Sequence, residues 1–307
     1  MLPFFFLPVD KPAGMTSHDV VARVRGAVRR RFPKGTKVGH SGTLDPFATG
    51  LLILGVGKAT RFSDEVHLLP KTYEAELVLG SETDTLDCDG RVCVHKPVPF
   101  FDDIKLEDIS KTFLGPIKQV PPSYSSKKVD GVRSYVLARE QRSVELQACD
   151  VVIHELKLSK LADDRIFLRV SCSTGTYVRS LGRDIAGALG SAGHLDALRR
   201  TRIGTVDHDL AYKMAIQEPV DPDILETYCM SVSNLLPSIP EMELPVTTLD
   251  PLLNGRQVPV GEPYPHQFLG KIQGVGRVAA IFRCQYDPDS QCVVPKMLCY
   301  RCPDIQK

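Results

Sequence analysis

One carboxylate stands in a setting that suits chemistry, the side chain of Asp45 in the stretch Val38–Leu52, VGHSGTLDPFATGLL. Three glycines in this stretch allow backbone conformations that residues with a Cβ avoid. Pro46 has no N–H group and biases Asp45 away from helix. The apolar run that follows, 51–56, suits a buried strand or the start of a packed helix. The pattern predicts an acid on a rigid loop that acts as nucleophile or base, although an Asp-Pro pair also opens ordinary turns.

Two further side chains could act beside this acid. Arg179 follows a turn at Gly175 and begins an apolar-periodic helix over 178–189. A guanidinium at that place is either an ordinary cation on a helix surface or a fixed partner for a buried carboxylate. Tyr73 opens the segment Lys71–Leu79, whose alternating apolar residues predict a half-buried strand.

Positive charge is concentrated in the sequence, although the net charge of the 307 residues is only +1. One window without acidic residues contains Arg23, Arg25, Arg29, Arg30, Arg31, Lys34 and Lys37, and a second cluster contains Arg199, Arg200 and Arg202. Acidic residues concentrate later, between 218 and 243. This separation suits nucleic-acid binding. A solvated helix face is the simpler explanation of the first cluster taken alone.

A third basic segment interleaves cations with aromatic residues. It contains Lys127, Lys128, Arg133 and Arg139, with Tyr124 shortly before them and Tyr135 among them. Segments of this kind can follow an RNA backbone and stack on bases.

Several motifs that would indicate a cofactor are incomplete. The stretch 55–60, GVGKAT, resembles a phosphate-binding loop but lacks its first glycine and the hydroxyl residue after Lys58. The stretch 83–90, TDTLDCDG, resembles a calcium loop but lacks carboxylates at the first and last ligand positions, so a hairpin turn is expected. The 9 cysteines include a single CxxC pair, whereas structural zinc usually needs two. We therefore expect no cofactor and no metal.

The remaining periodicities indicate an α+β fold. Thr16 and Asp19 have the spacing of a capping box, and apolar residues then recur at helical intervals from Val20 to Val28, with the arginines largely on the opposite face. Strands are expected over 4–10, 151–158 and 165–172, and a helix over 100–114.

Two domains are expected. Residues 1–245 form the larger one, within which the acidic, proline-containing segment 211–245 is a variable helical insertion or a loop. Residues 246–307 contain short β-rich runs separated by turns, which predict a small all-β module.

Composition limits the class of protein. With 43% hydrophobic and 24% charged residues the chain suits a globular protein. No apolar run approaches the roughly 20 residues that span a bilayer, and the apolar N-terminus lacks the features of a signal peptide. The cysteines are odd in number and irregularly spaced, which fits a reducing, cytoplasmic location.

Five stretches together resemble the motifs of the TruB family of tRNA pseudouridine synthases. They are GHSGTLDP continued by ATGLLILGVGKATR, DKPAGMTS, PPSYSSKK with the later YVLAR, STGTYVR, and GHLDALRRTRIG. The third stretch departs from the family at Ser126, where alanine is usual. The resemblance implies the pseudouridine synthase fold, a mainly antiparallel central sheet flanked by helices. It also implies that residues 246–307 form a PUA-like RNA-binding module.

The resemblance further implies an activity and a set of site residues. The activity is the isomerisation of the T-loop uridine conventionally numbered 55 in tRNA, which needs no cofactor. Asp45, Tyr73 and Arg179 would be catalytic: an ionised Asp45 is oriented by Arg179, and Tyr73 stacks on the flipped uracil. The residues expected to bind the substrate are His40, Tyr177, Leu198, Lys11, Arg199, Arg200 and Lys127. Attack on the base, attack on the sugar and removal of a sugar proton are all open to Asp45.

Two rival functions remain open at this point. The basic and aromatic segments would also suit an RNA-folding protein that does not need catalysis. The guide-RNA-directed branch of pseudouridine synthases has a related core. The small C-terminal module and the residues of the motifs, which resemble the bacterial type, favour a stand-alone enzyme. We expect a monomer that binds the T-arm of tRNA, without an obligatory protein partner and without a membrane.

Overall fold

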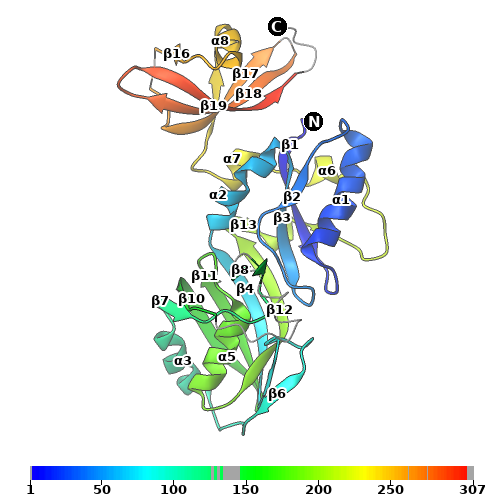
Figure 1. Cartoon of the computed structure of the whole chain (residues 1–307), viewed down its shortest axis with the longest axis vertical. Coiled ribbons are helices and arrows are strands. Elements are labelled where there is room, and N and C mark those ends of the chain that lie inside the picture. The colour runs from blue at the N-terminus through cyan, green and yellow to red at the C-terminus, as the bar shows by residue number, and fades with distance from the viewer. Residues whose placement is uncertain are drawn as a thin grey trace.

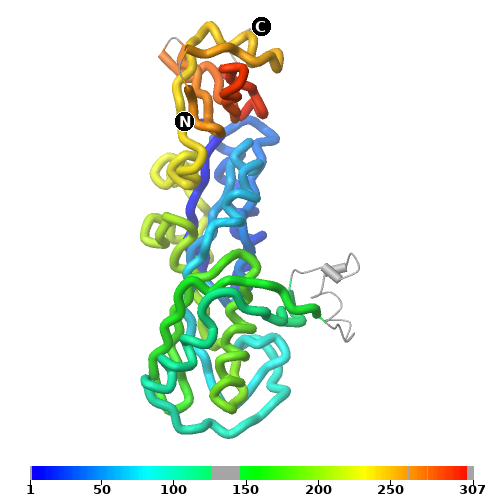
Figure 2. The backbone as a smooth tube through the Cα atoms, turned by 90° about the vertical axis from the view of Figure 1, so that its left-hand side faces the viewer, coloured from blue at the N-terminus to red at the C-terminus, as the bar shows by residue number. Residues whose placement is uncertain are grey.

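The computed structural model describes residues 2–125, 128–129, 132–133, 146–261, 263–274 and 276–302. They form an elongated molecule in which a large sheet occupies the lower and middle parts and a smaller sheet lies at the C-terminal end (Figure 1). A view turned by 90° shows the same long outline (Figure 2). None of the described helices is both long and apolar enough to cross a membrane.

Ten of the described strands form the large sheet. Its order is β14-β1-β3-β12-β4-β11-β10-β7, with β2 joined to β3 and β13 joined to β12. The strands are β1 (Phe4–Lys11), β2 (Val38–His40), β3 (Thr49–Gly57), β4 (Lys71–Leu79), β7 (Gly115–Gln119), β10 (Cys149–Ala162), β11 (Arg165–Cys172), β12 (Gly193–Ile203), β13 (Val206–Asp207) and β14 (Tyr212–Lys213). All pairs are antiparallel except β1–β14 and β3–β12, so the expected fold class is confirmed.

Helices cover the large sheet at both of its ends (Figure 1). They are α1 (Ser17–Arg31), α2 (Ser63–Leu68), α3 (Asp103–Thr112) and α5 (Val178–Ala188), and a 3-10 turn, η1 (Lys58–Phe62), precedes α2. The capping box expected at the start of α1 is present, because Thr16 and Asp19 bond each other's backbone N–H groups. The valines of α1 are buried against β1 and β3, which leaves its arginines on the outer side.

The expected strands and turns are also confirmed. The apolar run 51–56 is a strand within β3, not the start of a helix. The stretch 83–90 connects two short antiparallel strands, β5 (Ser81–Thr83) and β6 (Val92–His95), as a hairpin turn. Strands β10 and β11 pair with each other around residues 163–164.

The parallel contact between β3 and β12 joins the two halves of the sheet. Its register places Arg199 opposite Thr49 and Arg200 opposite Gly50. Gly50 has a φ of +101°, and a Cβ at that place would overlap the backbone carbonyl of Arg200. Only glycine allows this approach, and the approach brings the end of the Asp45 loop against β12.

The acidic segment 211–245 folds back onto the larger domain. It contributes β14 and two short helices, α6 (Ile224–Thr227) and α7 (Val232–Leu235). Glu226 of α6 forms an ion pair with Arg31 of α1. The segment therefore contains both the helical and the irregular structure that its sequence left open.

The C-terminal module is built on a sheet of five of the described strands, in the order β15-β17-β18-β19-β16. Its elements are β15 (Glu241–Leu244), α8 (Leu249–Leu253), β16 (Val258–Pro259), β17 (Gln267–Gly274), β18 (Arg277–Asp287) and β19 (Cys292–Arg301). Strand β15 lies before residue 246 in the sequence, yet it belongs to this sheet because its backbone pairs in parallel with β17. The sheet of the module therefore begins upstream of the boundary that the sequence suggested.

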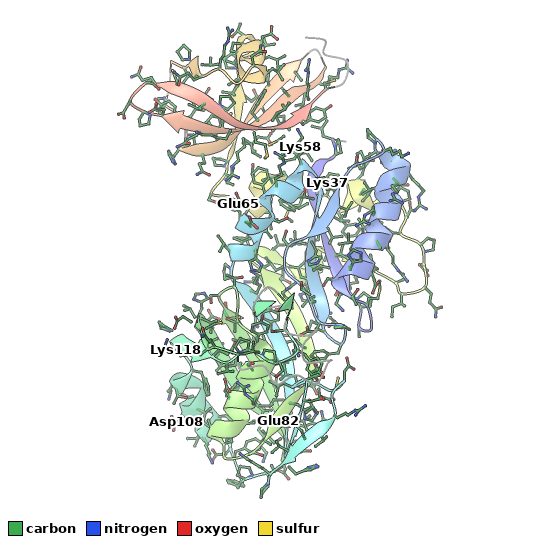
Figure 3. All side chains as sticks on the ribbon, in the orientation of Figure 1. Lys37, Lys58, Glu65, Glu82, Asp108 and Lys118 are labelled. Carbon is green, nitrogen blue, oxygen red and sulfur yellow. The ribbon has the colours of Figure 1, made fainter. Side chains whose placement is uncertain are left out.

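The module packs on η1 and α2 of the larger domain. Arg283 lies 5.0 Å from the ring centre of Phe62 and forms a 2.7 Å ion pair with Glu65. Lys58 donates to the carbonyl oxygen of Leu298 at 2.8 Å, and Figure 3 shows Lys58 and Glu65 just below the module. Apolar side chains of both parts share one core cluster, so the module is docked on the larger domain.

Candidate active site

The loop that carries Asp45 is held from below by a buried lysine. The side chain of Lys11 is fully buried, and its ammonium donates to the carbonyl oxygens of Pro12, Met15 and Pro46 at 3.0, 2.7 and 3.1 Å. All three ammonium protons therefore have protein acceptors. Burial lowers the pKa of Lys11 to about 8. Lys11 was expected to bind substrate; in the structure it fastens the residue after Asp45 instead.

A buried arginine holds the other side of the same loop. Arg200 is 1% exposed. Its guanidinium donates to the carbonyl oxygens of Leu51 and Gly42 at 2.7 and 3.1 Å. Since these carbonyls lie on both sides of Asp45 in the sequence, Arg200 clamps the loop closed.

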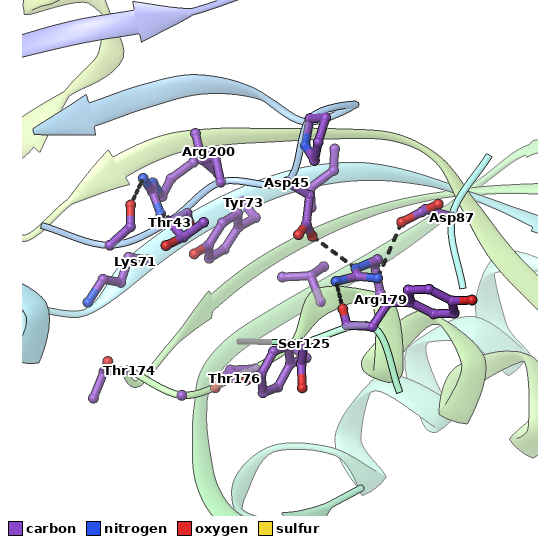
Figure 4. Close-up of a pocket in the computed structure, with 18 of the residues that line it drawn as sticks. Thr43, Asp45, Lys71, Tyr73, Asp87, Ser125, Thr174, Thr176, Arg179 and Arg200 are labelled. Carbon is purple, nitrogen blue, oxygen red and sulfur yellow. Dashed lines mark hydrogen bonds and ion pairs between the residues drawn. The ribbon is translucent and has the colours of Figure 1, made fainter. Parts of the chain in front are cut away.

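Arg179 links the loop to a second carboxylate (Figure 4). Its Nε lies 2.9 Å from Oδ2 of Asp45, and its Nη1 lies 3.3 Å from Oδ2 of Asp87. The guanidinium also donates to the backbone carbonyls of Thr85 and Tyr124, at 2.7 and 2.9 Å. With its side chain 5% exposed and every edge occupied, Arg179 has one available orientation.

The two carboxylates on Arg179 lie in different environments. The side chain of Asp45 is 36% exposed, whereas that of Asp87 is 7% exposed. Burial raises the pKa of Asp87, opposed by hydrogen bonds from Thr85 and by the charge of Arg179. Asp87 is thus enclosed around the guanidinium, while Asp45 keeps an open face toward the pocket.

Asp87 is a site residue that the sequence reasoning missed. It lies in the stretch 83–90, which we predicted to be a hairpin turn and to which we assigned no part in the site. A signal was present, because Thr85 and Asp87 have the spacing of a side-chain-stabilised turn, and Thr85 Oγ1 donates to Oδ1 of Asp87 at 2.6 Å. The approach of this turn to Arg179 depends on tertiary packing that no local pattern reveals.

Tyr73 forms the wall of the pocket opposite Arg179. The β4–β12 register places it beside Arg200, whose guanidinium carbon lies 5.9 Å from the ring centre. Burial raises the pKa of the Tyr73 hydroxyl, so the phenol is neutral at physiological pH. The side chain therefore offers a flat apolar face with a hydroxyl at its edge.

These groups surround one pocket of about 580 Å³. Most of the predicted site residues line it: Asp45, Tyr73, Tyr177, Arg179, Leu198 and Arg200. Asp87, Lys71, His67 and the turn 173–176 also contribute to its wall. The volume accommodates a nucleoside-sized ligand, and the side chains offer a carboxylate, a guanidinium and an aromatic face around it.

Four predicted residues are placed elsewhere. Arg199 forms a 2.6 Å ion pair with Asp10 and is not part of the pocket wall. His40 is half-buried outside the pocket, and its Nδ1 has no hydrogen-bond partner among the described residues. Burial lowers the pKa of His40. Lys11 lies beneath the loop, and Lys127 falls outside the described residues.

One group of residues in the described ranges has the spacing of metal ligands. Asp207, His208 and Asp209 bring ligand atoms within 4.8 Å of one another. Arg202 already pairs with Asp207 at 3.0 Å, and none of the three acidic or histidine residues lines the pocket. The pocket itself is formed without a metal-ligand group of this kind among its described residues.

Solved structures with the same architecture define the fold. A chain from an H/ACA RNP bound to a substrate RNA containing 2'-deoxyuridine matches with a TM-score of 0.64 and 18% identity, over 97% of this chain and 86% of that one. A chain from a Cbf5-Nop10-Gar1 complex matches with a TM-score of 0.63 and 21% identity, over 97% and 86%. At these identities the likeness concerns the fold alone, which is the pseudouridine synthase fold.

Sequence comparison identifies the family. The model described as TruB family pseudouridylate synthase (N terminal domain) matches residues 29–178. The tRNA pseudouridine synthase B of Azoarcus sp. is 40% identical over 252 residues, 82% of each chain. The tRNA pseudouridine synthase B of Psychrobacter cryohalolentis is 42% identical over 236 residues, 77% of this chain and 66% of that relative. The chain belongs to the TruB family of pseudouridylate synthases.

Proposed function

We propose that this protein converts uridine to pseudouridine in the T loop of tRNA, at the position conventionally numbered 55. The observation that carries the proposal is the convergence of Asp45, Tyr73 and Arg179 on one pocket, from three stretches far apart in the sequence. Family membership supports the reaction class, and the names of the relatives support tRNA as the substrate.

The reaction needs the target base outside its helical stack. Flipping a nucleotide costs a few kcal/mol, which the pocket must offset. The face of Tyr73 and the apolar side chain of Leu198 replace the lost stacking contacts. Tyr177 also lines the pocket. The volume and this mixed lining suit a uridine better than a purely polar or purely apolar ligand.

Asp45 is the reacting carboxylate of this proposal. Its open face points into the pocket, and Arg179 holds it at 2.9 Å in a fixed direction. The C1′–N1 bond breaks, the uracil turns and a C1′–C5 bond forms; C5 then loses its proton and N1 gains one, so the nucleotide keeps the same atoms. The protein therefore supplies one carboxylate, the surrounding charges and the position of the substrate. Pre-organised side chains of this kind are the main source of rate acceleration in such a site.

The C-terminal module serves as an additional RNA-binding part in this proposal. Its sheet includes residues 241–244, so we place its start there. The enzyme acts on tRNA as a monomer without an obligatory protein partner. A purified protein that modifies a bare tRNA transcript without guide RNA would separate it from the guide-directed branch.

The decisive experiment is the Asp45→Asn substitution. The expected result is complete loss of pseudouridine, read by nucleoside mass spectrometry or chemical labelling, with tRNA affinity within about threefold of wild type because the amide is isosteric. Wild-type turnover in this variant would falsify the role of Asp45. If the inactive variant restored all tRNA-related functions in cells lacking the protein, the non-catalytic RNA-folding role would replace the proposed one.

A further inference from the structure

The arginines of α1 divide into two groups with different partners. Arg23 donates to the carbonyl oxygen of Ala215 at 3.0 Å, and Arg30 donates to that of Val220. Arg31 pairs with Glu226. These three cations are engaged by the segment 211–245, so they hold that segment in place.

The other two arginines of α1 face a separate open cavity. Arg25 and Arg29 line it together with Lys34 and Lys37 of the following loop. The cavity has a volume of about 1010 Å³, and its remaining wall consists of Thr60 and the neighbouring residues of 35–39. Among the described residues that line it, none is acidic.

Four cations around one cavity repel one another unless an anion lies between them. None of the four forms an ion pair or a hydrogen bond with the side chains that the structure describes. On the same helix, three arginines have protein partners. The contrast indicates that the positive charge of the cavity serves an external polyanion.

The chain connects this cavity directly with the active-site pocket. Gly39 lines the cavity and Gly42 lines the pocket. Three residues span at most about 10 Å, the length that about three stacked nucleotides cover along one strand. His40 lies between the two, with its Nδ1 unpartnered among the described residues. A strand whose base enters the pocket therefore reaches the cavity with its neighbouring phosphates.

We propose that the cavity bounded by Arg25, Arg29, Lys34 and Lys37 is a second RNA site, which holds backbone phosphates of the strand adjoining the target nucleotide. The proposal rests on the proposed function and deepens it. The site recognises the charge and spacing of the phosphates and not the identity of the bases, because long flexible cations around an open cavity contact phosphates alone. The site increases the affinity for RNA and fixes the position of the strand relative to the pocket, and it takes no part in the reaction.

A pair of charge-matched double variants tests the proposal. Arg25→Gln with Arg29→Gln removes two cavity cations, and Arg23→Gln with Arg30→Gln removes two cations from the same helix that bond the segment 211–245. Glutamine keeps helix propensity in both variants. The readout is the Kd of a labelled T-arm stem-loop RNA over a range of salt concentrations, with kcat at saturating RNA.

The cavity variant is expected to raise Kd on the order of tenfold and to lower the log–log salt slope by about two, with kcat unchanged. The control variant is expected to keep the wild-type salt slope. A wild-type Kd and slope in the cavity variant would overturn the proposal, and so would equal losses in both variants. If the helix variant fails to fold, Lys34→Gln with Lys37→Gln tests the same site from the loop.

This outcome is separable from that of the proposed function. Absence of pseudouridine with the wild-type protein refutes the reaction, while the salt dependence of RNA binding still reports on the cavity. Normal activity together with an unchanged salt slope refutes the cavity site alone.

Discussion

The amide of Gln119 offers a sharp test of how the pocket is held together. Gln119 ends β7, and its side chain is 1% exposed. Its Nε2 donates to the carbonyl oxygen of Tyr177 at 3.1 Å, and its Oε1 accepts from the Tyr177 N–H at 2.8 Å. Tyr177 precedes the first turn of α5, in which Arg179 is the second residue. The amide therefore fixes the backbone from which Arg179 projects.

Replacement of Gln119 by leucine keeps the volume of the side chain and removes both hydrogen bonds. The N–H of Tyr177 then loses its partner, at about 1–3 kcal/mol, whereas the C=O loses one of two bonds, at about 0.5–1.5 kcal/mol, because it still accepts from the Leu181 N–H at 3.1 Å. The free energy of unfolding therefore falls by about 1.5–4.5 kcal/mol. A shift of about 1 Å in the guanidinium of Arg179 is worth on the order of 10²-fold in rate. We expect kcat to fall by that factor, with RNA affinity close to wild type.

Single-turnover pseudouridine formation, measured well below the unfolding midpoint of the variant, checks this expectation. Leu225→Ala provides a stability-matched control, because Leu225 is fully buried in a core cluster away from the pocket and its truncation costs about 2–5 kcal/mol. Gln119→Glu keeps the acceptor and loses the donor, so its rate should lie between those of wild type and Gln119→Leu. Wild-type kcat in Gln119→Leu at an equal stability loss would refute the positioning role.

The remaining predictions concern the neighbours of the loop and of α1. Asp87→Asn removes one of the two carboxylates on Arg179; a charge-assisted hydrogen bond is worth about 1.5–3 kcal/mol, so kcat should fall about 10–100-fold while RNA affinity stays near wild type. Burial lowers the pKa of Lys11 from 10.5 to about 8, so the unfolded chain binds the extra proton between these pH values. Stability relative to Lys11→Met should therefore rise by up to about 3 kcal/mol from pH 8 to 10.5 in denaturant titrations. Thr16→Ala removes the cap of α1 and should cost about 1 kcal/mol of unfolding free energy with kcat unchanged.

Each of these expectations has an opposing outcome. Unchanged kcat in Asp87→Asn would mean that Arg179 needs only Asp45 and the backbone carbonyls to keep its direction. A difference between wild type and Lys11→Met that is flat with pH would mean that Lys11 titrates at its ordinary value. A loss of activity in Thr16→Ala at normal stability would show that the N-terminus of α1 contributes to the site itself.

Much of the fold could be predicted from local patterns. The valines from Val20 to Val28 recur with the period of a helix, and the alternation over Lys71–Leu79 has the period of a strand. Both periods follow from the backbone geometry of the element alone, so they are visible without tertiary structure. The boundary of the C-terminal sheet was less accessible, because β15 is defined only by its pairing with β17.

The candidate site divides in the same way. Asp45, Tyr73 and Arg179 stand in unusual motifs, and the structure brings all three to one pocket, while their catalytic roles remain predictions. Lys11 and Arg200 also lie within the family motifs. The buried ammonium of Lys11 and the buried guanidinium of Arg200, however, donate to backbone carbonyls of the Asp45 loop. Residue type alone does not distinguish a cation that contacts RNA from one that holds a loop.

The sequence by itself determined most helices and strands, the family, and Asp45 as the acid at the centre of the proposal, because short-range periodicity and contiguous motifs are sufficient to identify them. The tertiary structure alone decided that Asp87 contacts Arg179, that Gln119 bonds the backbone of Tyr177 two residues before it, and that the cations of α1 separate into bonded and open groups. These contacts join residues 58 to 195 positions apart, and their geometry is set by strand register and packing. No local pattern in the chain encodes such distances.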